Sequence, residues 1–151
     1  MQAYTHFVAA ILLQNLLINQ HWSILIIVCY ISHIPIDVIA KATYHPHNPN
    51  FKDKFWVGYH VYVALFSIFI LYNYFSNYWL ALIASVLMDI WDWGIRRITL
   101  KFYPNMKIPL AHWMIEPIRE KFFKWLPDNT YQPEGVWLEI ILANSCLFTI
   151  L

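Results

Sequence analysis

The chain of 151 residues has the length of a single domain, and 60% of its residues are hydrophobic. Charged residues make up 13%, about half the fraction found in soluble domains, so the composition argues against an ordinary soluble protein. The formal net charge of +1 gives no reason to expect a nucleic acid as a partner.

The basic residues are confined to two segments that separate long runs without any charge. Residues 1–36 and 55–88 contain no Asp, Glu, Lys or Arg, and all ten Lys and Arg residues lie within 41–54 and 96–124. Such alternation is typical of polytopic membrane proteins, whose basic loops stay in the cytoplasm. We therefore predict an integral membrane protein with two cytoplasmic basic loops, and we expect no removable signal peptide.

Each uncharged run is long enough for a pair of helices. Thirty-six helical residues would extend about 54 Å, whereas the hydrocarbon core of a bilayer is about 30 Å thick. Polar residues at 19–21 divide the first run into helices of about 3–19 and 22–40. Polar residues at 73–78 divide the second run in the same way, and a last apolar segment completes five predicted transmembrane helices; the later helices are about 55–73, 78–98 and 135–151.

The predicted hairpins, about 3–40 and 55–98, form a weak internal repeat that runs from a His near the start to an Asp near the end. After the second hairpin, apolar residues recur at helical spacing over about 108–126, with basic residues among them. This pattern predicts an amphipathic helix on the cytoplasmic surface. Pro109 suits its start, and Pro117 should kink or split it. The predicted fold is an all-α membrane bundle forming one domain, residues 1–151.

Ionisable side chains gather at the predicted cytoplasmic end of this bundle. Pairs spaced three or four residues apart share a helical face, and single histidines lie about one turn inside the first and third helices; the residues are His6, His33, Asp37, His60, Asp89, Asp92, His112 and Glu116. An ionisable group at the bilayer centre costs about 2.5–3.5 kcal/mol, so such groups within spans need a reason. We expect them to form one site.

Imidazole and carboxylate groups are the ligands that zinc prefers, and they also suit iron or manganese. The predicted metal ligands are His6, His33, Asp37, His60, Asp92 and His112. Asp89 and Glu116 are the candidate catalytic groups, each acting as a ligand or as a general base. Arg96 and Arg97 could hold a substrate phosphate by bidentate contacts.

Simpler interpretations of the same residues stay open. Asp89 and Asp92 could pair with the following arginines as a structural clamp, and those arginines could be a topology signal alone. His112 and Glu116 could form a polar pair on the protein surface. Glu139 could reach the membrane interface, or it could add an acid to the site.

Several of these motifs resemble those of a known family. The run from Ser32 to Asp37 resembles the S-H-x-x-x-D element of the bacterial and archaeal membrane-bound metal-dependent hydrolases. Thr5-His6 resembles their opening motif, and the run from Met88 to Asp92 resembles a variant of their P-D-x-D element. His33-x-x-x-Asp37 and His112-x-x-x-Glu116 are also similar to pairs in zinc-dependent phospholipase C and the related single-strand nucleases.

The resemblance implies an all-helical enzyme that uses zinc to cleave a phosphoester. With the predicted topology, it indicates a membrane-embedded hydrolase whose cytoplasm-facing site acts on a small phosphoester such as a lipid headgroup. The alternative is a non-enzymatic membrane subunit, or a small transporter that uses the same cluster to bind or relay protons or metal ions. Membrane lipid is an expected partner in every case.

Overall fold

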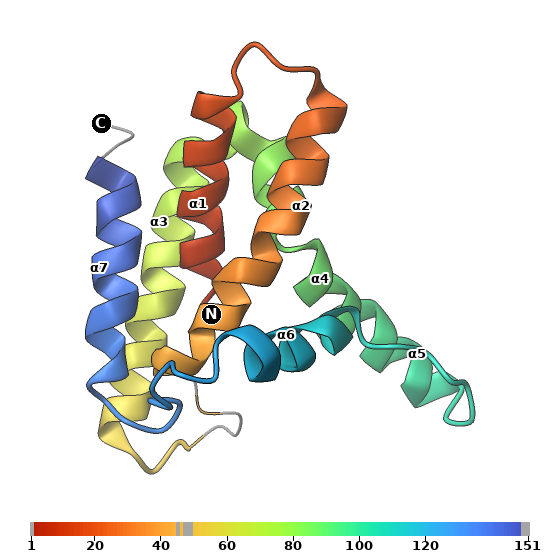
Figure 1. Ribbon diagram of the computed structural model, residues 1–151, viewed down its shortest axis with the longest axis vertical. Coiled ribbons are helices and arrows are strands. Elements are labelled where there is room, and N and C mark those ends of the chain that lie inside the picture. Colours follow the sequence, from red (N-terminus) through yellow and green to blue (C-terminus); the bar gives the residue numbers. More distant parts are fainter. Residues whose placement is uncertain (1, 45, 47–49, 149–151) are drawn as a thin grey trace.

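The computed structural model describes residues 2–44, 46 and 50–148, and every regular element among them is a helix (Figure 1). The all-α class predicted from the sequence is therefore confirmed for these residues. In chain order the elements are α1 (Ala3–Leu16), α2 (Trp22–Ile39), the 3-10 helix η1 (Ala40–Ala42), α3 (Lys54–Ser85), α4 (Leu87–Asp89), the π-helix η2 (Ile90–Ile95), α5 (Arg96–Phe102), the 3-10 helix η3 (Ala111–Met114), α6 (Ile115–Phe122) and α7 (Gly135–Phe148).

The first two helices form an antiparallel pair joined at residues 17–21, where the polar residues of the sequence predicted a turn. His21 caps α2, because its imidazole accepts a hydrogen bond from the backbone nitrogen of Ser23 at 3.3 Å. A cap of this kind satisfies one of the amide groups that have no partner inside the first helical turn. The chain thus returns along α1 and carries the His33–Asp37 motif toward the start of α1.

The second predicted hairpin is made by a single helix that bends back on itself. Helical hydrogen bonding continues through residues 73–78, so the break predicted there in the helix is wrong. The contacts with α1 nevertheless show a reversal at this place. The Tyr62 ring packs against Tyr4 at one end of α1, and the Asn77 carbonyl accepts a hydrogen bond from Gln14 at the other end.

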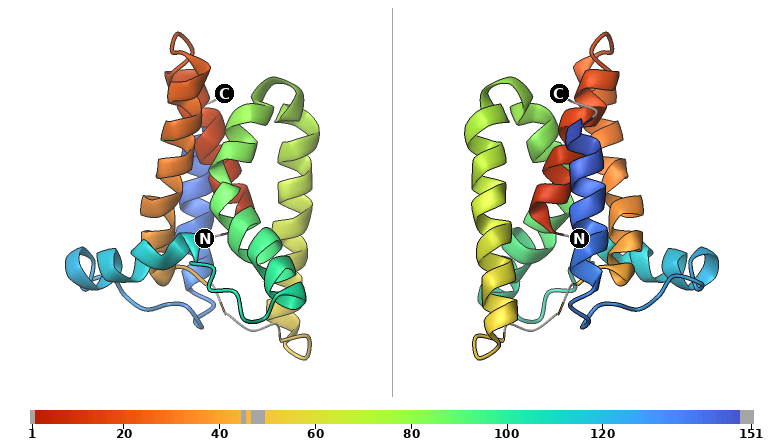
Figure 2. Two further views of the ribbon diagram at one scale, coloured as in Figure 1. Left: turned by 90° about the vertical axis from the view of Figure 1, so that its right-hand side faces the viewer. Right: turned by 90° about the vertical axis from the view of Figure 1, so that its left-hand side faces the viewer.

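The second half of α3 then returns to the start of α1. A straight helix would separate residues 62 and 85 by about 34 Å, yet the Ser85 carbonyl binds His33, whose ring stacks on His6. Figure 2 shows this rise and descent. At the bend, the Asn73 side chain donates a hydrogen bond to the Phe69 carbonyl at 2.8 Å. A side chain that bonds a carbonyl one turn back competes with the helical ladder and promotes bending.

The descending chain ends in short segments instead of the single predicted helix 78–98. Beyond Val86 it continues as α4, the π-helix η2 and α5. A π-helical turn contains an extra residue and changes the directions of the side chains that follow it, and such turns are frequent at functional sites. Here the π-helix lies between Asp89 and the two arginines at 96 and 97.

The amphipathic segment predicted at 108–126 is only partly helical. It begins as extended chain, turns into η3 and continues as α6, which ends at Phe122. The helix α6 continues through Pro117, which lies in the first helical turn, where a missing amide costs no hydrogen bond. The change from 3-10 to α geometry occurs two residues earlier, at Ile115.

The core surrounds α1, whose Tyr4, Val8 and Ile11 are fully buried against α3 and α7. Two helices, Trp22–Ala42 and Lys54–Ser85, are long and apolar enough to cross a membrane. Helices α1 and α7 each contain 14 residues, about 21 Å, which is less than the hydrocarbon thickness. The five-span arrangement therefore stays a prediction, and residues 149–151 of its last span lie outside the described residues.

The segments that carry the basic residues lie at one end of the bundle. In Figure 1 this is the lower end, where α5, α6, the start of α3 and the connection after α6 are found. The uncharged turn at 17–21 and the bend of α3 lie at the opposite end. The structure thus separates a basic end from an uncharged end, and the cytoplasmic orientation of the basic end stays a prediction.

Candidate metal centre

Four ionisable side chains from three separate elements converge at the basic end. His33 and Asp37 come from α2, Asp89 ends α4, and His112 lies in η3. One potential ligand atom from each lies within 4.8 Å of the others. The Asp37 Oδ2 atom is 3.2 Å from His33 Nε2 and 3.1 Å from His112 Nε2, and Asp89 Oδ1 is 3.4 Å from His112 Nε2. We call these four residues the ligand group.

The His33 ring is held by the end of α3. Its Nδ1–H donates to the Ser85 carbonyl at 2.7 Å, because a carbonyl oxygen can only accept. Ser85 is the last residue of α3, so its carbonyl has no partner within that helix. The proton is thereby placed on Nδ1, and the lone pair on Nε2 points into the ligand group. A backbone carbonyl in this position is a common support for a metal-binding histidine.

The His112 ring is held in the same way by Asp92. Its Nδ1 lies 2.5 Å from Asp92 Oδ2, and the same carboxylate accepts the backbone amides of His112 at 3.0 Å and Ala111 at 2.8 Å. Asp92 was predicted to be a metal ligand. The structure instead places it behind His112, with both of its oxygens bound to the η3 segment.

The two imidazoles face each other through their Nε2 atoms, the ring nitrogens that are not held by the Ser85 carbonyl or by Asp92. His33 Nε2 lies 2.9 Å from His112 Nε2, and each lies beside Asp37. Two lone pairs at this distance repel each other unless a proton or a metal cation lies between them. Burial lowers the pKa of His112, but hydrogen bonds to Asp37 and Asp92 outweigh it and raise the pKa to about 9. The donor set therefore favours a cation.

His6 stands next to the ligand group without belonging to it. Its ring is fully buried and stacks on His33, with ring centroids 4.0 Å apart. Its Nε2 is 3.2 Å from Asp37 Oδ1, the carboxylate oxygen that faces away from the other two imidazoles. His6 thus restrains Asp37 and His33 from the side of α1.

The other predicted site residues are placed differently. His60 does not join the ligand group: its Nδ1 bonds the Trp56 carbonyl at 2.8 Å, and its ring stacks on Trp56. Glu116 forms an ion pair with Arg119. Arg96 donates from Nε to the Ile108 carbonyl at 3.0 Å.

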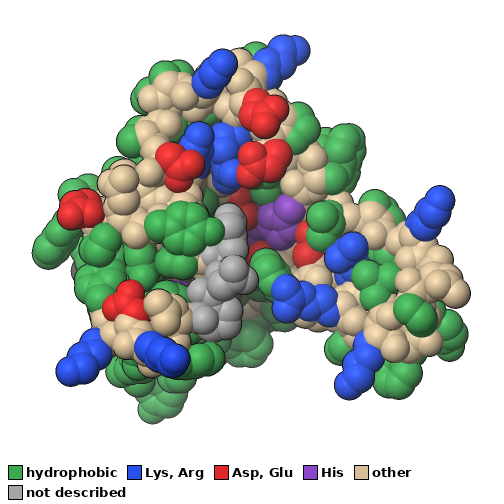
Figure 3. Space-filling model, turned by 90° about the horizontal axis from the view of Figure 1, so that it is seen from below, with side chains coloured by type: hydrophobic (Ala, Val, Ile, Leu, Met, Phe, Trp, Pro, Cys, Tyr) green, Lys and Arg blue, Asp and Glu red, His purple; other side chains and the backbone are tan. Residues whose placement is uncertain are grey.

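A cavity of about 610 Å³ opens on the ligand group, and we call it the metal cavity. Asp37, Asp89 and His112 lie on its wall, as do Asp92 and Glu116. Its remaining lining combines cations with apolar side chains: Arg96, Arg97, Arg119, Trp93, Leu110 and Ile115, with Gln2, Ala3 and Ala40. Seen from below, a histidine surface lies in a hollow with acidic and basic side chains around it (Figure 3).

Three supporting features were missed by the sequence reasoning. Arg119 donates to the carbonyls of Asp37 and Val38, at 2.8 and 3.3 Å, and so ties α6 to the end of α2. Trp91 and Arg96 bind backbone carbonyls of the 108–109 segment that precedes His112. An arginine or tryptophan that binds backbone carbonyls leaves no spacing pattern in the sequence, so no sequence signal could have found them.

Glu139 occupies neither of the places considered for it. It is fully buried in α7 and accepts hydrogen bonds from the Gln2 amide, the Thr5 hydroxyl and the Tyr59 hydroxyl at 2.7–2.8 Å. These bonds fix the start of α1 next to His6. Glu139 therefore supports the position of α1.

Comparison with protein-family models, curated proteins and solved structures finds no match for this chain.

Proposed function

We propose that the protein is a membrane-embedded, metal-dependent hydrolase that acts on a phosphoester, such as that of a lipid headgroup, at the cytoplasmic face. The observation that carries the proposal is the opposition of His33 Nε2 and His112 Nε2 beside Asp37, with both Nδ1 protons engaged elsewhere. The membrane part is supported by the two long apolar helices and the basic end of the bundle.

His33, Asp37 and His112 would hold the metal, and zinc suits a set of two imidazoles and a carboxylate. A bound divalent metal supplies Lewis-acid activation of water and of a phosphoryl oxygen. Asp89 has the most exposed side chain of the ligand group, at 32%, and lines the metal cavity. We assign it the role of general base, its Oδ1 accepting a proton from the attacking water.

The walls of the metal cavity fit an amphiphilic phosphoester. The Arg97 guanidinium lies over the Trp93 ring at 4.0 Å, which positions its charge at the cavity edge. Arg96 uses Nε for the Ile108 carbonyl and retains its terminal nitrogens for a phosphate oxygen. Exposed apolar side chains nearby, Trp93 and Leu110, suit the contact with lipid.

The proton- or metal-relay alternative has less support. A relay through the bundle needs a polar path to the uncharged end. Residues 7–13 of α1, between His6 and Gln14, are all apolar. Gln14 and Asn15 are engaged with the bend of α3, through the Asn77 carbonyl and the Tyr78 hydroxyl.

The test is metal analysis of detergent-purified protein, followed by hydrolysis assays with a short-chain phospholipid. We expect at least one zinc per chain, loss of most of it in the double variant His33→Ala with Asp37→Ala, and loss of activity with it. His60→Ala serves as the matched control, because His60 lies outside the ligand group. Full zinc retention in the double variant would refute the metal centre, and zinc binding without hydrolysis would refute the enzyme.

A further inference from the structure

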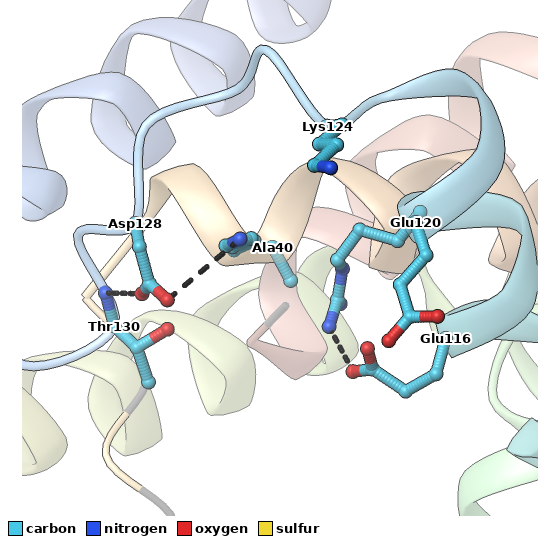
Figure 4. A pocket seen from close by; sticks show the side chains of 8 residues that line it. Ala40, Glu116, Glu120, Lys124, Asp128 and Thr130 are labelled. Atoms are coloured by element: carbon cyan, nitrogen blue, oxygen red, sulfur yellow. Dashed lines mark hydrogen bonds and ion pairs between the residues drawn. The ribbon is translucent and has the colours of Figure 1, made fainter.

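A second cavity, of about 600 Å³, lies beside the metal cavity and has a different lining. It is formed by η1, by α6 and by the segment that follows α6 (Figure 4). Its lining residues are Ala40, Lys41, Glu116, Arg119, Glu120, Lys124, Asp128 and Thr130. We call it the charged cavity. None of these side chains is aromatic, and only that of Ala40 is purely apolar.

The two cavities share a wall. Ala40, Glu116 and Arg119 line both of them. Arg119 also donates to the carbonyl of Asp37, a member of the ligand group, at 2.8 Å. The Arg119–Glu116 ion pair thus stands between the metal cavity and the charged cavity.

Charges of both signs face the charged cavity, where Glu116 already forms an ion pair with Arg119. On α6, Glu116 and Glu120 are four residues apart and share a face, and Figure 4 shows the Glu120 side chain directed toward Glu116. Lys41 forms an ion pair with Asp128 at 3.8 Å. Among the described residues, Glu120 and Lys124 form no ion pair with each other, although they are only four residues apart in the chain.

The residues that line the charged cavity are unsuited to several classes of ligand. Nucleobases and sugars are usually bound by stacking on aromatic side chains, which the charged cavity lacks. A polyanion would meet the carboxylates of Glu116, Glu120 and Asp128, and an acyl chain would have to desolvate the charged groups. A small zwitterion meets an opposite charge for each of its own charges.

We propose that the charged cavity binds the ammonium and carboxylate of a phosphoserine-type headgroup whose phosphate lies at the metal centre. The ammonium lies between Glu116 and Glu120, and the carboxylate binds Lys124 and Lys41. The inference rests on the proposed function for the position of the phosphate. The same chemistry is offered by free O-phosphoserine and by phosphatidylserine in a bilayer.

Binding to zinc-loaded protein in detergent should be measured for three matched soluble ligands. These are O-phosphoserine, phosphoethanolamine, which lacks the carboxylate, and glycerol 3-phosphate, which lacks both charged groups. We expect O-phosphoserine to bind at least about tenfold more tightly than glycerol 3-phosphate, with phosphoethanolamine in between, since each tenfold step needs only one modest charged contact. Equal affinities for the three ligands would overturn the proposal.

Two variants test which side chain binds the ammonium of the ligand and which binds its carboxylate. Glu120→Gln should remove the preference for phosphoethanolamine over glycerol 3-phosphate, and Lys124→Gln should remove the preference for O-phosphoserine over phosphoethanolamine. Lys121→Gln is the matched control, because Lys121 is on α6 but does not line the charged cavity. If both variants keep the wild-type order of affinities, the charged cavity is not the binding site.

Vesicles distinguish the two sources of the headgroup. Hydrolysis of phosphatidylserine in preference to phosphatidylglycerol would support a lipid ligand, and a preference confined to the soluble ligands would assign the site to free phosphoserine. The preferred binding of O-phosphoserine without any hydrolysis would support the charged cavity and refute only the hydrolase. Hydrolysis with no preference among the headgroups would support the hydrolase and refute the charged cavity as the headgroup site.

Discussion

Asp92 offers the sharpest test of the metal centre, because it holds His112 without facing the ligand group. Its Oδ2 accepts the His112 Nδ1 proton at 2.5 Å and the His112 amide at 3.0 Å, while Oδ1 accepts the Ala111 amide. Asp92→Asn preserves the size of the side chain and leaves one oxygen as an acceptor. The NH2 group that replaces the other oxygen can only donate, so one of the hydrogen bonds accepted by Asp92 is lost.

The substitution should therefore act on the tautomer of His112. An amide nitrogen that faces Nδ1 in place of Oδ2 favours an acceptor there, which moves the ring proton to Nε2 and blocks the lone pair that points toward Asp37. Disturbing such a supporting partner typically lowers metal affinity about 10–100-fold. This corresponds to about 1.4–2.7 kcal/mol of binding free energy.

Zinc affinity should be measured for both proteins by competition with a chromophoric chelator in detergent. Asp53→Asn is the matched control, because Asp53 caps α3 through the amides of Phe55 and Trp56, and asparagine caps equally well. We expect the control to retain wild-type affinity. Wild-type affinity in Asp92→Asn, with the fold intact by thermal unfolding, would refute the assignment of His112 as a ligand.

Three further outcomes are expected. Because the pKa of His112 is raised to about 9, its ring is protonated at pH 7 and a metal must displace that proton; zinc affinity should rise about tenfold per unit between pH 6 and pH 8, and a flat profile would contradict this. Glu139→Gln disrupts a buried carboxylate that accepts three hydrogen bonds, so it should destabilise the protein by about 1–3 kcal/mol, visible as a lower unfolding temperature in detergent. Cysteine placed at Asn77 should be labelled from outside intact cells and cysteine at Lys52 should not, and the reverse pattern would overturn the predicted orientation.

Local spacing was sufficient to predict one half of the ligand group. His33 and Asp37 are four residues apart, and α2 brings them onto one face as the sequence indicated. Spacing alone could not distinguish Asp89 from Asp92, because residues three apart share a face to a similar degree. The position of η3 decides between them, since it occupies Asp92 and leaves Asp89 beside the imidazoles.

The internal repeat is informative in the same way. It gives His6 and His60 equivalent positions in the chain, yet only His6 lies beside Asp37. The bend of α3 returns its second half to the start of α1, which brings Ser85 to His33, whereas the His60 ring packs on Trp56. His6 and His60 thus have the same place in the repeat but different neighbours in the folded protein, because the helices around them pack differently.

Composition and spacing within single helices are enough to predict the helical class, the clustering of basic residues at one end and the chemistry available to a metal. Which ligands meet depends on the packing of the helices, since His112 and Asp89 reach Asp37 through contacts between segments more than 50 residues apart. The same holds for Arg119 and the charged cavity. Contacts of this kind depend on how whole helices pack, and no local period in the chain encodes them.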